Sequence, residues 1–84
     1  MKVIWQPKAM KQLKKIGDKS VQERLLGAAK SLSSFPDCQN VKRLTSHRYD
    51  FRLRAGNWRI LFDALETVKA ISIEEVKKRD ERTY

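Results

Sequence analysis

Cysteine and histidine are almost absent from this sequence, whose 84 residues contain one of each, Cys38 and His47. A single cysteine permits no internal disulfide, which fits a reducing compartment such as the cytoplasm. One cysteine and one histidine also cannot supply the ligands of a Cys/His zinc site. We therefore expect neither a metal nor another cofactor.

Long hydrophobic runs are missing as well. No apolar stretch approaches the roughly 18 residues that a membrane span needs. The N-terminus does not resemble a signal peptide, because Lys2 interrupts it and Gln6, Pro7 and Lys8 follow only three apolar residues. We expect a cytoplasmic protein that does not contact a membrane.

Acidic residues are few compared with basic ones. Lys and Arg number 19 and Asp and Glu number 10, which gives a formal net charge of +9. This excess indicates a polyanionic partner, most simply nucleic acid, although an ordinary basic domain with a solvated surface has the same composition. Hydrophobic residues make up 40% of the chain, which is enough to fold, and the length predicts a single domain over residues 1–84.

The N-terminal part of the chain predicts a strand and a first helix. Residues 1–5 are rich in β-forming side chains and predict a short strand. From residue 7 to residue 16 the apolar side chains recur at helical spacing, and Pro7 suits the first turn of a helix. Gly17 is expected to end this helix.

A second helix and a β-meander complete the expected fold. Asp18 or Ser20 can cap the second helix, whose apolar positions run from Val21 to Leu32, and a loop is expected over residues 33–40. A strand, a helical hairpin and an antiparallel meander together make an α+β domain. The expected strands of the meander are residues 41–44, 48–54, 58–63 and 68–76, with tight turns at 56–57 and 65–67.

The segment 48–54 alternates strictly between apolar and charged side chains. Tyr49, Phe51 and Leu53 share one face of the expected strand, and the charged residues share the other. The aromatic residues expected in the core are Trp5, Phe51, Trp58 and Phe62.

The turn at Gly56-Asn57 fixes the register of the hairpin around it. In that register Arg54 lies opposite Arg59, and like charges in opposed positions destabilise a sheet by several tenths of a kcal/mol. With Arg52 on the same face, three guanidinium groups converge, and such groups bind phosphate bidentately. We therefore expect a phosphate site here. Arginines that splay into water, or a different turn register, would remove this signal.

The charged segment 77–84 follows the last expected strand. A terminus of mixed charge is ordinarily a frayed and solvated end. Tyr84 follows a basic run, however, and a tyrosine ring can stack on a nucleobase while its phenol exchanges a proton.

These features resemble the RelE/ParE toxin superfamily over nearly the whole chain. The resemblance is carried by the order of the elements, by the segment Arg48-Tyr-Asp-Phe-Arg-Leu-Arg-Ala-Gly-Asn-Trp-Arg-Ile-Leu-Phe62 and by the ending Lys77-Lys-Arg-Asp-Glu-Arg-Thr-Tyr84. The pattern hydrophobic-Arg-x-Arg-x-Gly-x-aromatic-Arg is the most specific part. The basic tail ending in tyrosine is similar to the RelE branch, which consists of ribosome-dependent mRNA endoribonucleases of toxin–antitoxin pairs.

This resemblance implies a fold, an activity and partners. The fold is the RelE-like microbial RNase fold, and the activity is metal-independent cleavage of mRNA in the ribosomal A site by attack of the 2′-hydroxyl. The implied partners are mRNA, the 70S ribosome with its 16S rRNA, and a cognate antitoxin that neutralises the toxin.

The resemblance also implies roles for individual residues. Arg52 and Arg54 match basic catalytic residues on their strand, and Arg59 matches the arginine that contacts the scissile phosphate. Arg79 matches the basic residue that begins the tail. Tyr84 matches the tyrosine that stacks on the cleaved nucleotide and can act as base.

Two positions leave alternatives open. Asp50 stands where some members of the branch have a lysine. The spacing between Arg79 and Tyr84 differs from the family pattern, so Lys78 or Arg82 could take the role of Arg79 in binding RNA. The lysines of the first helix form either a solvated face or a contact with the backbone of ribosomal RNA. These lysines are Lys8, Lys11, Lys14 and Lys15.

Cleavage of RNA by its own 2′-hydroxyl needs a base, positive charge on the phosphate oxygens and an acid. Arginines can supply the electrostatic part. A scheme with two histidines is excluded, because His47 is the only histidine, but His47 alone is an alternative base. Glu74 and Glu75 are expected to face solvent or to pair with neighbouring cations.

Two other functions remain open from the sequence. A ParE-like poison of DNA gyrase would use the same fold without cutting RNA. A non-catalytic module would use the same charge only to bind nucleic acid.

Overall fold

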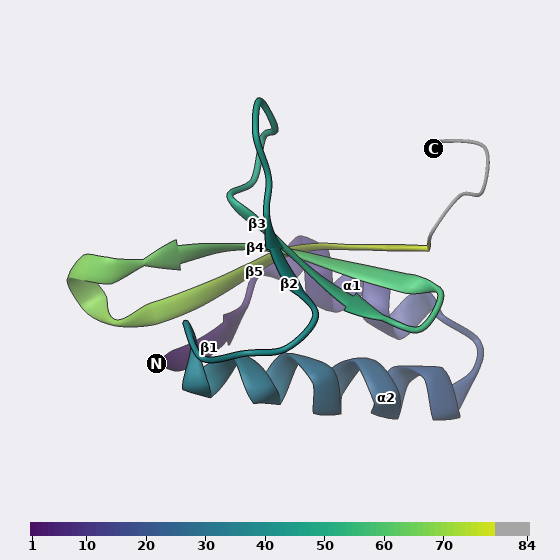
Figure 1. Cartoon of the computed structure of the whole chain (residues 1–84). Helices are drawn as coiled ribbons and strands as arrows, with labels where there is room; N and C mark the ends of the chain where they lie inside the picture. The colour runs from purple at the N-terminus through teal and green to yellow at the C-terminus, as the bar shows by residue number, and fades with distance from the viewer. Residues whose placement is uncertain (79–84) are drawn as a thin grey trace.

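Two helices pack on one face of a five-stranded sheet (Figure 1). A computed structural model of the protein describes residues 1–78. The strands lie in the order β1-β5-β4-β3-β2. The elements in chain order are β1 (Lys2–Trp5), α1 (Pro7–Lys15), α2 (Lys19–Lys30), a 3-10 turn at Ser31–Ser34, β2 (Val41–Arg43), β3 (Phe51–Ala55), β4 (Trp58–Leu65), a 3-10 turn at Glu66–Val68 and β5 (Ala70–Lys78).

The predicted α+β order is confirmed, with one pairing that the sequence did not predict. Strands β2 to β5 form the antiparallel meander. Strand β1 joins the edge of the sheet beside β5 and runs parallel to it, with Val3 opposite Ile71. Parallel neighbours need a long crossover, and the helical hairpin together with the first three strands of the meander provides it. Neither helix is long and apolar enough to cross a membrane within residues 1–78.

Helix α1 confirms the expected helix but not the way it ends. It begins at Pro7, whose missing N–H costs nothing in a first turn. It ends at Lys15, because Ile16 is already extended, with φ −70° and ψ 118°. The helix ends just before Gly17, close to the predicted end, but Gly17 does not form a left-handed cap, since Gly56 is the glycine with a positive φ among residues 1–78.

Asp18 and Ser20 are the two predicted caps of α2, and the hydrogen bonds show which of them acts. Oδ1 of Asp18 accepts a hydrogen bond from the Ser20 backbone N–H at 2.9 Å and another from the Val21 backbone N–H at 3.4 Å. Asp18 is therefore the N-cap, and it satisfies backbone donors that the helix leaves open.

The core lies between the helices and the sheet. Phe62 is fully buried at its centre, and Trp5, Phe51 and Trp58 pack against it partly buried, so the expected aromatic core is confirmed. The Phe35 ring meets both Phe51 and Phe62 edge-on, with centroids 5.0 and 5.9 Å away. The side of the sheet that faces away from the two helices is the open face. The fully buried large side chains are Phe62, Leu25, Leu32, Ile60, Ile71 and Ile73.

A β-bulge interrupts the pairing of β5 with β4. Leu61 pairs with Glu75, but the next residue, Phe62, pairs with Ile73, so Glu74 is an extra residue on β5. Ile73 is fully buried in the core. Without the bulge, simple alternation would send Glu75 into the core as well.

The bulge therefore decides which side chains of β5 reach each face. Val76 takes the core position and is 5% exposed. Glu75 and Lys77 turn to the open face, and Lys78 turns back to the side of the helices.

The strand limits differ from the expected ones in three places. The strand expected over 48–54 begins at Phe51, and the strand expected over 58–63 continues to Leu65. The last strand begins at Ala70 rather than at residue 68 and continues to Lys78, because Glu66–Val68 forms a 3-10 turn that ends in the left-handed Lys69 with φ 53°. The segment between β2 and β3 rises from the sheet on the side away from α2 (Figure 1).

Candidate functional site

The β3–β4 hairpin has the register expected from its turn. Arg54 lies directly opposite Arg59, and Arg52 lies opposite Leu61. Gly56 has φ 60°, the left-handed conformation that favours glycine in tight hairpin turns. The alternative register, which would separate Arg54 from Arg59, is excluded.

A third strand extends this pair of arginines into a row. Lys77 of β5 lies opposite Arg59 on β4, which lies opposite Arg54 on β3. We call Arg54, Arg59 and Lys77 the cationic row. Adjacent strands lie about 4.8 Å apart, so the three side chains leave the open face at closely spaced points.

Arg52 and Lys42 add charge beside the cationic row. They are paired across β2 and β3, two residues along the strand from Arg54. Arg54 is exposed, whereas Arg52 and Arg59 are half-buried. Guanidinium and ammonium groups both bind phosphate oxygens, and guanidinium groups suit bidentate contacts best.

Sequence reasoning missed Lys77 as a member of this site. It placed residue 77 in a terminal tail, whereas β5 continues to Lys78. The signal that could have revealed the bulge is the spacing of Ile71, Ile73 and Val76, which breaks strict alternation by one residue. Lys78, a candidate RNA-binding residue, lies on the other face of the sheet.

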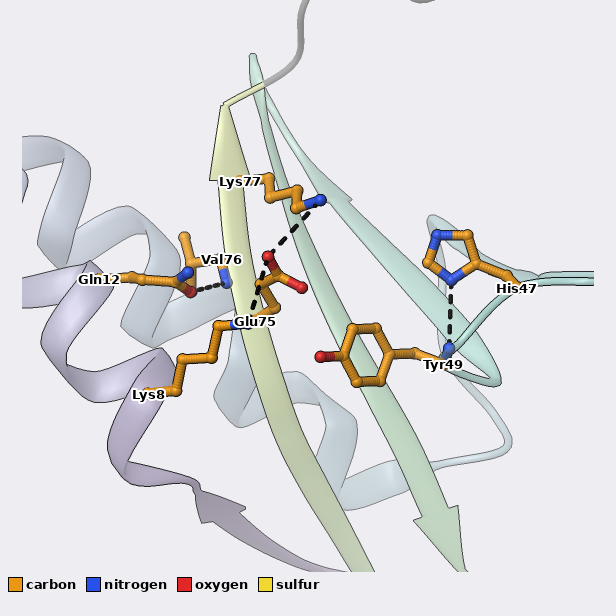
Figure 2. A network of polar contacts seen from close by, with 7 residues as sticks. All are labelled: Lys8, Gln12, His47, Tyr49, Glu75, Val76 and Lys77. Carbon is orange, nitrogen blue, oxygen red and sulfur yellow. Dashed lines mark hydrogen bonds and ion pairs between the residues drawn. The ribbon is translucent and has the colours of Figure 1, made fainter.

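One carboxylate lies among these cations. Oε1 of Glu75 is 3.5 Å from the Lys77 ammonium and 3.8 Å from the Lys8 ammonium of α1, as Figure 2 shows. The Glu75 side chain is only 13% exposed, while both lysines are more than half exposed. Helix α1 is anchored beside it, since the Val76 backbone N–H donates to Oε1 of Gln12 at 2.7 Å. The expectation that Glu75 pairs with neighbouring cations is confirmed.

Tyr49 does not lie where its sequence pattern placed it. It precedes β3 and is buried, yet it is not part of the core cluster. Its hydroxyl points toward Glu75 on the open face (Figure 2). Burial raises the pKa of the Tyr49 phenol above its ordinary 10.0, the Arg48 guanidinium opposes this rise, and the Glu75 carboxylate adds to it. The phenol is therefore protonated at neutral pH.

His47 lies on the far side of Tyr49 from Glu75 (Figure 2). Its Nδ1 accepts a hydrogen bond from the Tyr49 backbone N–H at 3.1 Å, and its ring is 6.0 Å from the tyrosine ring. This bond engages one ring nitrogen in holding the loop, which leaves Nε2 for solvent.

The remaining candidate residues divide into two groups. Lys8 forms an ion pair with Glu75, a residue of the open face. Lys11, Lys14 and Lys15 are exposed along α1. Arg79, Arg82 and Tyr84 lie outside the described residues. Within residues 1–78 no group of three or more His, Cys, Asp or Glu side chains could hold a metal ion.

A groove of about 510 Å³ opens between α2 and the end of β3. Arg24 and Arg54 both line it, so it adjoins one end of the cationic row. The Arg24 guanidinium lies against the turn, because a Cβ at Gly56 would be 3.1 Å from its Nη1. Cys38, also in the wall, is a free thiol whose pKa is raised by burial, so it stays protonated.

Comparisons with known proteins give one family match and several solved structures of the same fold. The family model described as "ParE toxin of type II toxin-antitoxin system, parDE" matches residues 3–83. A search of curated protein sequences gives no match.

Three solved structures share the fold. The archaeal RelE in its complex with RelB from Pyrococcus horikoshii OT3 is 24% identical, with a TM-score of 0.78 over 95% of this chain and 96% of that one. The RelBE2 complex of Mycobacterium tuberculosis gives 20% identity and a TM-score of 0.77 over 93% of this chain and 96% of that one. The isolated RelE toxin of E. coli gives 17% identity and a TM-score of 0.75 over 95% of this chain and 85% of that one.

Proposed function

The chain belongs to the ParE toxin family of type II toxin–antitoxin systems, within the RelE/ParE superfamily, and we propose that it is an endoribonuclease that cleaves mRNA in the ribosomal A site. The observation that carries this proposal is the cationic row of Arg54, Arg59 and Lys77 with Arg52 beside it. A row of opposed like charges weakens the sheet, and a bound phosphate would offset that repulsion.

In this proposal the arginines bind the scissile phosphate. Arg59 lies in the middle of the row, between Arg54 and Lys77, and would contact the phosphate there. As the 2′-oxygen attacks, negative charge grows on the non-bridging oxygens, and preorganised guanidinium groups stabilise it. The 2′-oxygen bonds to phosphorus, the bond to the 5′-oxygen breaks, and the products are a 2′,3′-cyclic phosphate and a free 5′-hydroxyl.

In this proposal the ribosome orients the mRNA, and residues 79–84 add a stacking ring and a cation. The ribosome would hold the mRNA in line for attack, which can provide much of the rate enhancement. The lysines of α1 would contact ribosomal RNA without sequence preference. Tyr84 would stack on the nucleotide beside the cleaved bond, and Arg79, or Arg82 in its place, would add a cation there.

A cognate antitoxin would neutralise the toxin. The open face carries most of the site, so an acidic segment that folds on binding would cover it and remove the phosphate site. The structural relatives RelBE2 of M. tuberculosis and RelBE of E. coli are described as toxin–antitoxin complexes, which supports this partner.

The experiment that tests the function is primer extension on cellular mRNA after induction, comparing the wild-type protein with Arg59→Ala. Cuts at defined codon positions inside translated frames, absent from the folded variant, support the proposal. Growth arrest without such cuts would overturn it.

A second function has one observation in its favour, which is that the matching family model is named for ParE. A ParE-like protein would poison DNA gyrase and leave mRNA intact. Gyrase-dependent DNA breaks after induction, with intact mRNA, would establish that function instead. Binding of RNA without cleavage on translating ribosomes would indicate the non-catalytic module.

A further inference from the structure

Glu75 is a carboxylate that the fold places beside the cationic row. It owes this position to the bulge at Glu74, which moves Glu75 from the core side of β5 to the open face. There it lies beside Lys77 along the strand and opposite Leu61, the residue that also faces Arg52.

The two oxygens of Glu75 have different surroundings. Both lysine ammonium groups approach the same atom, Oε1, at 3.5 and 3.8 Å. The other oxygen turns toward the Tyr49 hydroxyl in the open face (Figure 2). The lysines hold the side chain by one oxygen, and the Tyr49 hydroxyl hydrogen-bonds to the carboxylate. A carboxylate oxygen can accept two hydrogen bonds, so the second oxygen can still accept a further hydroxyl donor.

We infer that Glu75 is the general base that accepts the 2′-hydroxyl proton during cleavage. This inference rests on the proposed endoribonuclease function and names the base that the function requires. Oε2 takes the proton, the 2′-oxygen bonds to phosphorus, and the bond from phosphorus to the 5′-oxygen breaks. Water protonates the departing 5′-oxygen, and the resulting hydroxide removes the proton from Glu75.

Other described candidates are engaged in holding the fold. Oε2 of Glu74 accepts a hydrogen bond from the Ser72 hydroxyl, and Oδ1 of Asp63 accepts one from the Asp50 backbone N–H at 2.8 Å. Nδ1 of His47 accepts from the Tyr49 backbone N–H. Glu75 also hydrogen-bonds to the Tyr49 hydroxyl, but its ion pairs are with lysines that a phosphate could draw away as it enters the site.

Several charged or titratable groups face Glu75. Helix α1 presents Lys8, β5 itself presents Lys77, and the loop before β3 presents Tyr49. Arg52 and Arg59 leave the neighbouring strands on the same face.

The test is single-turnover cleavage of a defined mRNA on purified ribosomes across a pH series, with Glu75→Gln, Glu75→Asp, Lys77→Met and the matched control Glu74→Gln. Glu75→Gln should lower the cleavage rate by about 10²- to 10⁴-fold and abolish the fall in rate at acidic pH. Its binding to ribosomes should match that of the wild type. Glu75→Asp should recover part of the rate, and Glu74→Gln should cleave normally.

The outcomes separate the two claims. If the wild type does not cleave mRNA on ribosomes, the proposed function fails and the inference fails with it. If the wild type cleaves and Glu75→Gln cleaves as fast as Glu74→Gln, only the inference is overturned. An equal loss in Lys77→Met and Glu75→Gln, with unchanged pH profiles, would also overturn it, because Glu75 would then act only by positioning Lys77.

Discussion

Arg54 and Arg59 lie directly opposite each other across the β3–β4 hairpin, on the face of the sheet that the helices leave uncovered. Alternation of apolar and charged residues fixes their faces, and the two-residue turn at Gly56-Asn57 fixes their opposition. Because like charges in this position repel, a bound anion would relieve the repulsion. Lys77, the third member of the cationic row, adds a like charge on a third strand.

Replacing Arg54 separates function from stability. Arg54→Thr removes one of two opposed like charges and places a β-branched residue on the strand, so the free energy of unfolding should rise by several tenths of a kcal/mol. Cleavage or RNA binding should fall in the same variant. Urea denaturation and a binding assay measure the two effects, and a less stable Arg54→Thr protein would contradict the account.

Lys77 and Lys78 provide a test that compares adjacent residues of one type. Lys77 lies in the cationic row and Lys78 on the other face of the sheet. Lys77→Ala should weaken binding of a single-stranded RNA and reduce its salt dependence, whereas Lys78→Ala should do so less. Binding titrations at several salt concentrations measure this, and equal effects of the two changes would show that the bulge does not direct Lys77 to the site.

Gly56 and Gly27 should respond to alanine in opposite directions. Gly56→Ala introduces a Cβ at φ 60°, 3.1 Å from Nη1 of Arg24, so it should destabilise the protein by about 1–3 kcal/mol. Gly27 lies inside α2, where an added Cβ would meet nothing within 4 Å, so Gly27→Ala should stabilise by about 0.5–1 kcal/mol. Thermal melts of both variants check the signs, and stabilisation by Gly56→Ala would be inconsistent with this turn.

The Asp18 cap predicts a pH dependence of stability. Hydrogen bonds from Ser20 and from the Val21 backbone N–H lower the pKa of Asp18 below its ordinary value of 3.8. The folded state therefore binds this proton less well than the unfolded chain, so the cap stabilises fully above that value. Its contribution disappears as the pH falls through the lowered pKa.

Asp18→Ala should lower the melting temperature at neutral pH, and Asp18→Asn should lower it less, since asparagine also caps. The difference between wild type and Asp18→Asn should shrink at acidic pH. Melting curves over a pH series measure this, and a difference that grows on acidification would refute the cap's role.

Local patterns were enough to predict much of this fold. The Arg54–Arg59 opposition followed from alternation and one turn, and the helices followed from apolar spacing. The parallel pairing of β1 with β5 could not be predicted, because it depends on how the whole chain returns across the sheet. Such long-range pairing leaves no signal in adjacent residues.

The missed part of the candidate site has a single cause, the bulge at Glu74. One extra residue reverses the faces of everything after it, so Glu75 and Lys77 join the site and Lys78 leaves it. Tyr49 was placed wrongly for a similar reason, because its alternation continues the pattern of β3 into a segment that is not a strand. The roles of Arg79, Arg82 and Tyr84 stay predictions from the sequence.

The most direct test of the central claim is the chemistry of the cleaved RNA. Purified protein should cut an mRNA on a ribosome with an open A site and leave a 2′,3′-cyclic phosphate and a 5′-hydroxyl, as mass spectrometry of the fragments can show. The same mRNA with a 2′-deoxy nucleotide at the cleavage position should stay intact. Cleavage of the deoxy-substituted mRNA, or no cleavage of the natural one, would contradict the claim that this sheet holds a phosphate for attack by the 2′-hydroxyl.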